Sequence, residues 1–572
     1  MVKFKPNTEV DFVVIGSGAA GGIMAKELSV AGFSVVVLEQ GGPGKYGHEQ
    51  DYNKDELLNM YPPTADDRLM SDLKLQPNTF RRNANEKAEP GNSRYGCVLG
   101  GGTVTYGGSS WRHLPYEFNE ATHEGTIAGT GLVDWPITYD ELEPYYTKAE
   151  WELGISGLRV DTPFFAPMSK PYPVPPMPQK ASGALLKVAA AKLGLTVVPN
   201  VAAIISQPYM GRPGCINCGM CSGFGCQVKA RSSSAVTMIP IAENTGRCEI
   251  RTRSYVREIS VGKNGRVTGA VYFDAKKNEI FQKAKAVVLS ANGLETPRLL
   301  LLSKSNRFPD GLANSNGVVG RYLMSGNFSN ASGLFEHPLN EYKGIVSGAA
   351  ILDYVPSDPK RGFYGGGRMT GRGQEEPIQY GLQVGAHRPV VVRGDRGQPE
   401  PNQSGPQTPK WGAEYKKLLQ EDANRKMTIA SFITQLPLET NRVDLDPDVK
   451  DAWGLPAMRI TASTHPDDVK CMEFFRQRSI EILHAAGATS VSAEPVSDSR
   501  GGAHSRGTCR MGNDPQTSVV NKYHRTHEVP NLIVVDGSSF VTGGRNHPTM
   551  TIQALAFRAA EHLIADARKG SV

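Results

Sequence analysis

Four cysteines within twelve residues form the densest group of reactive side chains in the sequence. The segment GRPGCINCGMCSGFGCQVKA (211–230) holds half of the eight cysteines at the spacing C-x2-C-x2-C-x4-C: Cys215, Cys218, Cys221 and Cys226. Sulfurs three residues apart around a glycine-rich bend can reach one metal centre, and C-x2-C-x2-C begins the cluster motif of bacterial ferredoxins. The spacing therefore favours an iron–sulfur cluster.

Three alternatives for this cysteine segment stay open. A disulfide between Cys215 and Cys218 would close a tight ring of the strained, redox-active kind. Structural zinc usually takes two separated C-x2-C pairs, a pattern that this segment fits poorly. The four cysteines could also be free and unrelated, as is expected of the scattered ones, which read as small buried hydrophobic side chains.

A second chemical signature lies near the amino terminus, in DFVVIGSGAAGGIMAKELSVAGFSVVVLEQGG. Gly16, Gly18 and Gly21 have the G-x-G-x-x-G spacing between an apolar strand and a helix. The first glycine permits a tight turn, the second lets a pyrophosphate approach the backbone, and the third lets the helix pack on the strand. The next strand, SVVVLE, ends at Glu39, where an acid can bind an adenosine ribose. These residues predict a dinucleotide site.

A second glycine-rich stretch, GCVLGGGTVTYGGSSWRHLP (96–115), indicates that the dinucleotide is FAD rather than NAD. Closely spaced glycines bring backbone against a flat ligand without side-chain clashes. A flavin held at both ends has a use for such a stretch, which makes Gly101, Gly102 and Thr103 candidate cofactor contacts.

Two further segments supply elements for the same α/β unit. AKAVVLSANGLETPRLLLLS predicts a strand, a turn and a helix that begins at Thr296–Pro297. NLIVVDGSSFVTGGRNHPTMTIQALAFRAAEHLIAD predicts the last strand, a loop and the closing helix. Asp536 ends that strand, where its carboxylate can hold hydroxyl groups of the cofactor.

Together these motifs resemble the glucose–methanol–choline (GMC) family of flavin oxidoreductases, over nearly the whole chain. The resemblance implies an α/β (overall α+β) fold, with a Rossmann-like FAD-binding domain and a substrate domain built on an antiparallel sheet over the flavin. FAD-binding segments are expected at 8–115, 246–328 and 496–572, with a cap that carries the cysteine loop at 116–245 and the substrate domain at 329–495. Asn292–Gly293 departs from the small residue pair usual in the family's second signature.

The resemblance also assigns two histidines. His504 in HSRGTC matches the family's catalytic histidine, and His547 in NHPTMTIQALAFR matches the second active-site position, although Asn546 leaves the register uncertain by one residue. Oxidation of an alcohol needs a base that is neutral at working pH, which suits histidine. We expect His504 to be the general base and His547 to orient the substrate hydroxyl. The remaining histidines are expected in surface or turn positions.

Flavoprotein (large) subunits of membrane-associated sugar, gluconate and polyol dehydrogenases resemble this chain at the GRP that precedes the first cysteine. In them a 3Fe–4S cluster occupies this loop, and Cys215, Cys221 and Cys226 match best; Cys218 is additional, so a 4Fe–4S cluster is a second possibility. The resemblance implies an FAD-dependent dehydrogenase of a sugar, polyol or sugar acid that passes electrons through the cluster to a cytochrome or another one-electron acceptor.

Partners follow from the same resemblance: a small chaperone-like subunit that bears the export signal, and a membrane-anchored cytochrome c subunit. The chain would then lie on the periplasmic side of the inner membrane, with a cytoplasmic location as the alternative. Its first apolar segment is too short for a signal peptide, and no apolar run reaches the ~20 residues of a membrane helix. The net charge of +6 shows no basic block, which argues against nucleic-acid binding.

Rival functions are an alcohol oxidase that uses oxygen, a soluble dehydrogenase whose cysteine loop is structural or holds zinc, and a flavin-binding protein with a decayed active site. Substrate specificity is expected to lie around 330–390 and 425–440.

Overall fold

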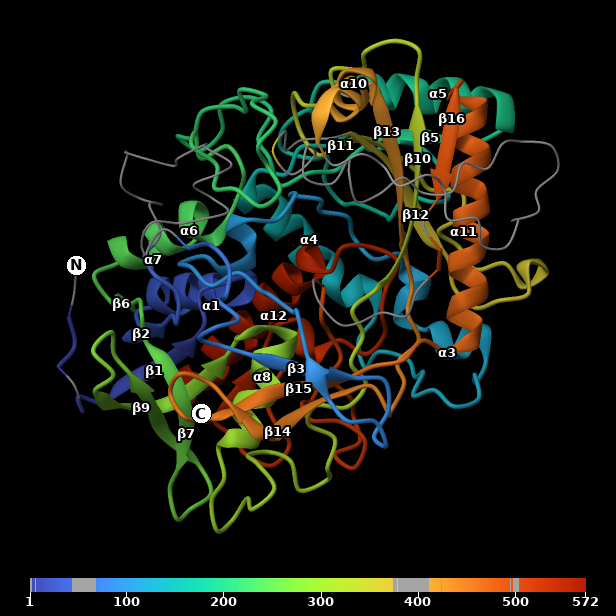
Figure 1. Ribbon diagram of the computed structural model, residues 1–572. Coiled ribbons are helices and arrows are strands. Elements are labelled where there is room, and N and C mark those ends of the chain that lie inside the picture. Colours follow the sequence, from blue (N-terminus) through green and yellow to red (C-terminus); the bar gives the residue numbers. More distant parts are fainter. Residues whose placement is uncertain are drawn as a thin grey trace.

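The computed structural model describes residues 3–5, 7–43, 68–373, 378, 411–422, 424–493, 495–496 and 504–572 (Figure 1). It combines an α/β unit with an antiparallel sheet, as the sequence predicts. In Figure 1 the α/β unit lies at the lower left and the antiparallel sheet at the upper right.

A seven-stranded mixed sheet forms the centre of the α/β unit, in the order β6-β2-β1-β9-β8-β7, with β17 paired to β9. The parallel part joins strands from distant segments: β1 (Val10–Ile15), β2 (Val35–Leu38), β6 (Cys248–Arg251), the end of β9 (Glu279–Leu289) and β17 (Leu532–Val534). Antiparallel strands β7 (Tyr255–Val261) and β8 (Val267–Phe273) extend it. The central strands are buried along their length, as is typical of parallel strands covered by helices.

Helices cover this sheet. α1 (Ala19–Val30) packs against α12 (Thr549–Arg568), and α12 packs in turn against α4 (Tyr139–Leu153). Three short helices also lie in the first half of the chain: α3 (Glu120–Glu124), α6 (Ser234–Thr237) and α7 (Ile239–Asn244). The first and last helices of the unit therefore lie side by side, which brings the amino-terminal glycine motif near the carboxy-terminal histidines.

The second sheet has six antiparallel strands in the order β16-β10-β13-β12-β11-β5. Their bounds are β5 (Val197–Pro199), β10 (Asn327–Leu334), β11 (Ser347–Ile351), β12 (Gly367–Gly373), β13 (Lys426–Ile433) and β16 (Ser490–Ala493). Helices α5 (Ala181–Leu193) and α11 (Pro466–Ala485) pack on one face with an apolar core that includes Leu186, Met369 and Phe475. The opposite face of this sheet lines the candidate functional site.

A third sheet lies apart from the antiparallel sheet that the family resemblance implies. The segments NRVDLDP and AMRITAS contribute to strands β14 (Arg442–Lys450) and β15 (Pro456–Thr461). They pair with β3 (Asn78–Arg81) and β4 (Glu89–Pro90) in a separate four-stranded sheet, and do not join the sheet of β13. Local alternation identifies a strand, but it cannot identify a partner several hundred residues away.

The helix predicted to begin at Thr296–Pro297 starts earlier. α8 (Asn292–Leu302) places Pro297 inside the helix, where it has no N–H for the carbonyl of Gly293. The hydroxyl of Thr508 donates to that carbonyl instead, at 2.8 Å. The Asn292 side chain accepts from the backbone N–H groups of Leu294 and Glu295 and so caps the new start.

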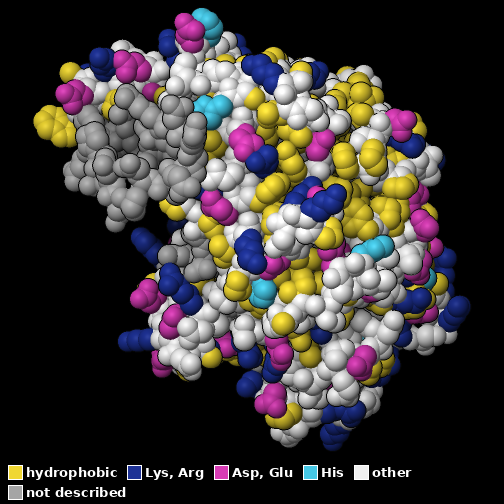
Figure 2. Space-filling model, turned by 90° about the vertical axis from the view of Figure 1, so that its right-hand side faces the viewer, with side chains coloured by type: hydrophobic (Ala, Val, Ile, Leu, Met, Phe, Trp, Pro, Cys, Tyr) yellow, Lys and Arg dark blue, Asp and Glu magenta, His cyan; other side chains and the backbone are white. Residues whose placement is uncertain are grey.

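The surface on the side of α5 and α11 mixes hydrophobic and charged side chains (Figure 2). Exposed apolar residues include Val188 and Leu193 in α5 and Val469 in α11, and Trp411 precedes α10 (Gly412–Asp422). In the described parts of the chain, no helix combines the length and apolarity needed to span a bilayer. The expected five-segment division into domains stays a prediction.

Candidate functional site

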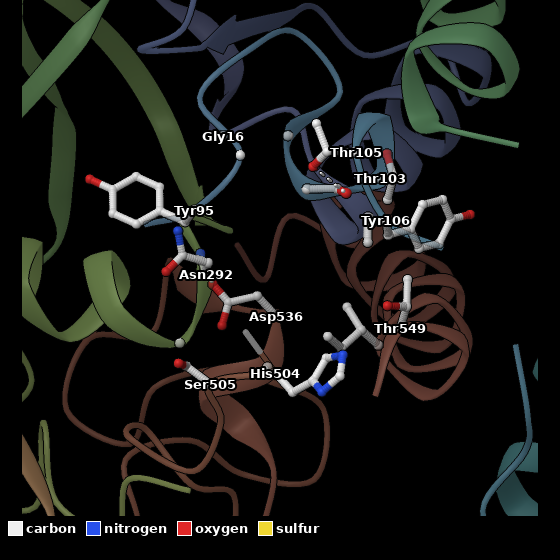
Figure 3. A pocket seen from close by; sticks show the side chains of 18 of the residues that line it. Gly16, Tyr95, Thr103, Thr105, Tyr106, Asn292, His504, Ser505, Asp536 and Thr549 are labelled. Carbon is white, nitrogen blue, oxygen red and sulfur yellow. Dashed lines mark hydrogen bonds between the residues drawn. The ribbon is translucent and has the colours of Figure 1, made fainter. Parts of the chain in front are cut away.

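A cavity of about 710 Å³ lies between the α/β unit and the open face of the antiparallel sheet. Both glycine-rich stretches line it, together with Glu39, Asp536, His504 and His547. In the close view, Gly16 and Thr103 lie above the open centre, and His504 lies below it (Figure 3). One cavity thus brings together most of the predicted cofactor and catalytic residues.

The three glycines of the amino-terminal motif have separate structural roles. Gly16 has φ +92°, and a Cβ there would lie 2.4 Å from the Ser290 carbonyl oxygen. A Cβ on Gly21 would lie 2.0 Å from the Gly16 oxygen, so Gly21 permits helix-to-strand packing and does not itself line the cavity. A Cβ on Gly18 would meet nothing within 4 Å, which leaves that backbone open to a ligand. α1 begins at the next residue and directs its free N–H groups there.

The second glycine-rich stretch adjoins the first. Gly101 has φ +55°, and a Cβ on it would lie 3.0 Å from the Cα of Gly18. Thr103 donates to the Gly100 carbonyl at 2.6 Å and accepts from the backbone N–H of Ser234. Gly101, Gly102 and Thr103 all line the cavity. The two turns therefore form one continuous backbone cradle.

Two buried carboxylates flank this cradle. Glu39 accepts from the backbone N–H and the hydroxyl of Ser17 and from the N–H of Gly41, at 2.7–3.1 Å. Asp536 accepts from Asn292 N–H, Thr296 hydroxyl and Ser538 N–H, at 2.6–2.9 Å. Burial raises the pKa of both carboxyls despite these hydrogen bonds. Both line the cavity, where their remaining lone pairs can accept from ribose or ribityl hydroxyls.

These residues fit FAD. The open backbone at Gly18 and the amino terminus of α1 suit the pyrophosphate, Glu39 suits the adenosine ribose, and Asp536 suits the second half of the cofactor. The glycines of the cradle leave open for the cofactor the space that larger side chains would fill. When bound, FAD supplies an acceptor for the two electrons of an oxidation.

The two predicted histidines meet at the side of the cavity that faces the antiparallel sheet. The ring centroids of His504 and His547 are 5.0 Å apart, with the planes near perpendicular at 82°. Phe432 of β13 contacts His547 at a centroid distance of 3.9 Å, and Phe328 of β10 lies 5.7 Å from His504. Two aromatic side chains of the sheet thus hold the histidine pair against the cavity.

Sequence reasoning missed the residue behind this pair, Arg368 of β12. Its guanidinium is fully buried; one nitrogen lies 2.8 Å from Nδ1 of His547, and another donates to the side-chain oxygen of Asn546 at 2.7 Å. It also lies over the rings of Trp111 and Phe432, at 4.7 and 5.7 Å. Burial lowers the pKa of Arg368 to about 9, so it remains a cation at neutral pH.

This contact fixes the tautomer of His547. An arginine side chain has donors and no acceptor, so the Nδ1 atom that faces Arg368 must accept and carry no proton. The proton of the neutral ring is then on Nε2, which makes His547 a hydrogen-bond donor toward the cavity. His504 has no such constraint from Arg368. The geometry therefore favours His504 as the base and His547 as the donor that orients an oxygen.

Electrostatics keep both rings neutral. Desolvation and the charges of Arg506 and Arg368 lower the pKa of His504 to about 3. Desolvation, His504 and three nearby arginines lower the pKa of His547 well below its usual value. A neutral imidazole is the form that can accept a proton from a hydroxyl group.

The structure also settles the register at Asn546 and His547. Asn546 is buried and donates to the Arg112 carbonyl at 3.0 Å, whereas His547 lines the cavity. One expectation for the other histidines was wrong: His113 is fully buried and lies outside any turn. His524 lies in a turn, as predicted, but it is fully buried, and its Nδ1 contacts the Val534 carbonyl at 3.1 Å inside the core. Of the scattered cysteines, Cys248, Cys471 and Cys509 are buried as expected, and Cys97 is half-buried.

The cysteine loop adjoins the cavity through its backbone. Ser222 and Gly223 line the cavity, and the N–H of Gly223 donates to the Thr105 carbonyl at 2.7 Å. Arg231, which is buried, donates to the carbonyls of Cys221 and Phe224 in the loop and to Val104 in the second glycine-rich stretch. The loop is therefore anchored beside the candidate flavin site.

The four cysteines themselves do not form a metal site in this structure. Cys221 is buried, Cys215 and Cys226 are half-buried, and Cys218 is exposed. Within the residues that the structure describes, no three side chains of His, Cys, Asp or Glu come together in an arrangement that could hold a metal ion. The arrangement of these thiols in this structure thus does not fit a cluster.

The fold and the cavity suit an FAD-dependent oxidoreductase, with two histidines at the side of the cavity that faces the antiparallel sheet. Sequence models of the family named "GMC oxidoreductase" match residues 10–324 and 437–556. The chain therefore belongs to the GMC oxidoreductase family, whose relatives here act on CH–OH groups.

Individual relatives agree with this assignment. The chain is 35% identical to 2-methyl-1,2-propanediol dehydrogenase of Mycolicibacterium austroafricanum, over 97% of this chain and 95% of that protein. It is 30% identical to the fructose dehydrogenase large subunit of Gluconobacter japonicus, over 98% of both chains. The structure of formate oxidase from Aspergillus oryzae superposes on that of this chain with a TM-score of 0.65 at 15% identity. The alignment covers all of both chains. The resemblance to the large subunits of sugar dehydrogenases is confirmed.

The lowered histidine pKa values predict an unusual pH profile. The base acts when unprotonated, so activity falls as the pH drops through its pKa in the folded enzyme, about 3 for His504. The rate of anaerobic flavin reduction by an alcohol should stay within about twofold between pH 5 and 8, because both rings are neutral throughout. A histidine with an ordinary pKa of ~6.5 would instead lose about 30-fold by pH 5, and that loss would contradict the assignment.

Proposed function

We propose that this enzyme is an FAD-dependent dehydrogenase that oxidises a hydroxyl-bearing carbon of a sugar, polyol or sugar acid. The observation that carries the proposal is the neutral histidine pair at the sheet side of the FAD-sized cavity, with Arg368 bound to one ring. The names of two relatives, a diol dehydrogenase and a fructose dehydrogenase subunit, support a hydroxylated substrate.

The chain's own groups would divide the work in the following way. Nε2–H of His547 donates to the substrate oxygen and orients the carbinol. A ring nitrogen of His504 accepts the hydroxyl proton as the carbon–hydrogen bond breaks, so that C–OH becomes C=O; bound FAD would supply the acceptor for the hydride. Phe328 and Phe432 pack beside the rings and hold them in position. Arg368 keeps Nδ1 of His547 unprotonated through the cycle.

Replacing His504 tests this proposal. In His504→Asn, reduction of the flavin by the best alcohol in a panel of sugars, polyols and sugar acids should slow by at least about 100-fold, because a positioned base contributes 10²–10⁴-fold. Stopped-flow absorbance of the anaerobic holoenzyme measures this rate. His562→Asn is the matched control, since His562 lies on α12 near Tyr523, outside the cavity. Unchanged reduction in His504→Asn would contradict the proposal.

The same assay separates dehydrogenase from oxidase. Turnover with ferricyanide or a cytochrome c should greatly exceed hydrogen peroxide formation in air. Rapid peroxide formation at a rate equal to turnover would instead assign the chain to the oxidases of the family.

We retain the iron–sulfur cluster as a separate proposal, on which no step above depends. The C-x2-C-x2-C-x4-C spacing supports it, as does the position of the loop against the cavity. Cys215 packs in one small apolar cluster with Cys221 and in another with Cys226, so modest side-chain rearrangement could bring these three sulfurs together. A small chaperone-like subunit, a cytochrome c subunit and a periplasmic location belong to the same proposal, which the name "large subunit" of one relative supports.

Metal analysis tests the cluster proposal. The anaerobically purified protein should contain about three or four iron atoms and matching acid-labile sulfide per flavin, with a low-temperature EPR signal in the oxidised state for a three-iron cluster or in the reduced state for a four-iron one. Cys221→Ser should lose iron, while Cys471→Ser, at a buried cysteine away from the loop, should keep it. Iron-free protein that retains flavin and activity would rule the cluster out.

A further inference from the structure

A row of polar side chains on β12 faces the cavity. Thr370 and Arg372 line it, and Arg368, at the next alternate position, contacts His547. The intervening residues face the helices: Met369 belongs to the core with α5 and α11, and a Cβ on Gly371 would lie 2.9 Å from Leu186. Because side chains alternate along a strand, Arg368, Thr370 and Arg372 share the cavity face.

The two arginines of this row differ in their partners. Arg368 is engaged with His547 and Asn546. Arg372 is half-buried, and its side chain makes no hydrogen bond or ion pair with any residue that the structure describes. Its charge nevertheless reaches His547, since it is one of the groups that lower the pKa of that histidine. Arg372 is thus a cation that lines the cavity, on the same strand face as Arg368, without a counter-ion among the described residues.

The carboxylates near β12 and around the cavity that the structure describes are already engaged. Among the described residues that line the cavity, the acids are Glu39, Glu295 and Asp536. Glu39 and Asp536 flank the glycine cradle, and Glu295 accepts from Tyr95 at 2.6 Å and from Arg298 at 3.1 Å. Glu341, which is next to Gly373 on the other face of the strand, binds Ser182 and Lys180.

The phosphates of FAD have another place. The open backbone at Gly18 and the start of α1 lie against the glycine cradle, whereas Arg372 lies on the sheet side of the cavity, on the strand that carries Arg368. A half-buried guanidinium without a counter-ion is costly, and its planar set of N–H donors matches a carboxylate in a two-point contact. A substrate that carries a carboxylate would supply the missing charge.

We propose that Arg372 is an anion subsite that binds the carboxylate of the substrate, and that the preferred substrate class is therefore a hydroxylated carboxylic acid such as a sugar acid. The inference rests on the proposed function, which it narrows to one of the three substrate classes. The carboxylate is a binding group and is unchanged by the reaction. The carbinol carbon is oxidised at the histidines, and Arg372 fixes the other part of the molecule.

Matched pairs of substrates test the subsite. Gluconate and glucitol, and two further aldonate–alditol pairs, differ in the carboxylate at one end of the same carbon chain. The wild-type holoenzyme should show a higher kcat/KM for the acid of at least one pair. Arg372→Gln should lower that kcat/KM about 30-fold, mainly through KM, and change the value for the neutral partner less than about threefold. Arg372→Lys should recover part of the loss.

One control variant and the flavin spectrum distinguish the possible outcomes of this experiment. Arg307→Gln removes an exposed arginine next to Gly265 in the α/β unit and should change neither value. The visible flavin spectrum shows that each variant holds its cofactor, and Arg372→Lys carries the test if the glutamine variant does not fold. Wild-type preference for the neutral partners, or an equal loss on both members of a pair, would overturn the subsite alone. Failure of every alcohol to reduce the flavin would overturn the proposed function and the subsite with it.

Discussion

The contact between Arg368 and His547 is the constraint on which the site depends. It joins the antiparallel sheet to the segment before α12, and so ties the substrate side of the cavity to the cofactor side. A buried guanidinium without a carboxylate partner is expensive, and the rings of Trp111 and Phe432 together with Asn546 stabilise it only in part. The imidazole nitrogen is its second hydrogen-bond acceptor beside Asn546, while its buried Nε has no partner among the described residues. The tautomer and position of His547 are therefore fixed before any substrate arrives.

The rest of the fold brings the reactants to this contact. α1 and α12 pack side by side, so the first glycine motif and the last loop of the chain line one cavity. The close approach of Gly101 to Gly18 joins two turns that are distant in sequence into one cradle. The cofactor cradle carries buried acids and open backbone, whereas the sheet side carries cations and neutral imidazoles. This separation of acidic and cationic groups suits a cofactor with many hydroxyl groups on the acidic side of the cavity. It suits an electron-rich substrate on the cationic side.

Local patterns predicted the cofactor cradle well, because its chemistry depends on residues close together in the chain. The strand, turn and helix around Gly16, and the acids Glu39 and Asp536, could be placed from sequence alone. Arg368 could not, because its position depends on the register of β12 against β13, and that pairing crosses a long intervening segment. The alternating pattern RMTGR was the available signal, although it does not identify which face meets a histidine. The start of α8 was missed for a similar reason, since the group that replaces the absent N–H of Pro297 is Thr508.

The cysteine spacing shows a different limit, because a motif gives the order of possible ligands but not the convergence of their sulfurs. Within the 330–390 range expected to set specificity, Arg372 is described, while 374–377 and 379–390 lie outside the described residues. The protonation of the His547 ring can be measured directly. Nitrogen NMR of holoenzyme with ¹⁵N-labelled histidine, assigned with His547→Asn, should show an unprotonated Nδ1 and a protonated Nε2 on His547 at pH 7, and Arg368→Met should release that preference. A protonated Nδ1, or an imidazolium, in the wild-type enzyme would contradict the account.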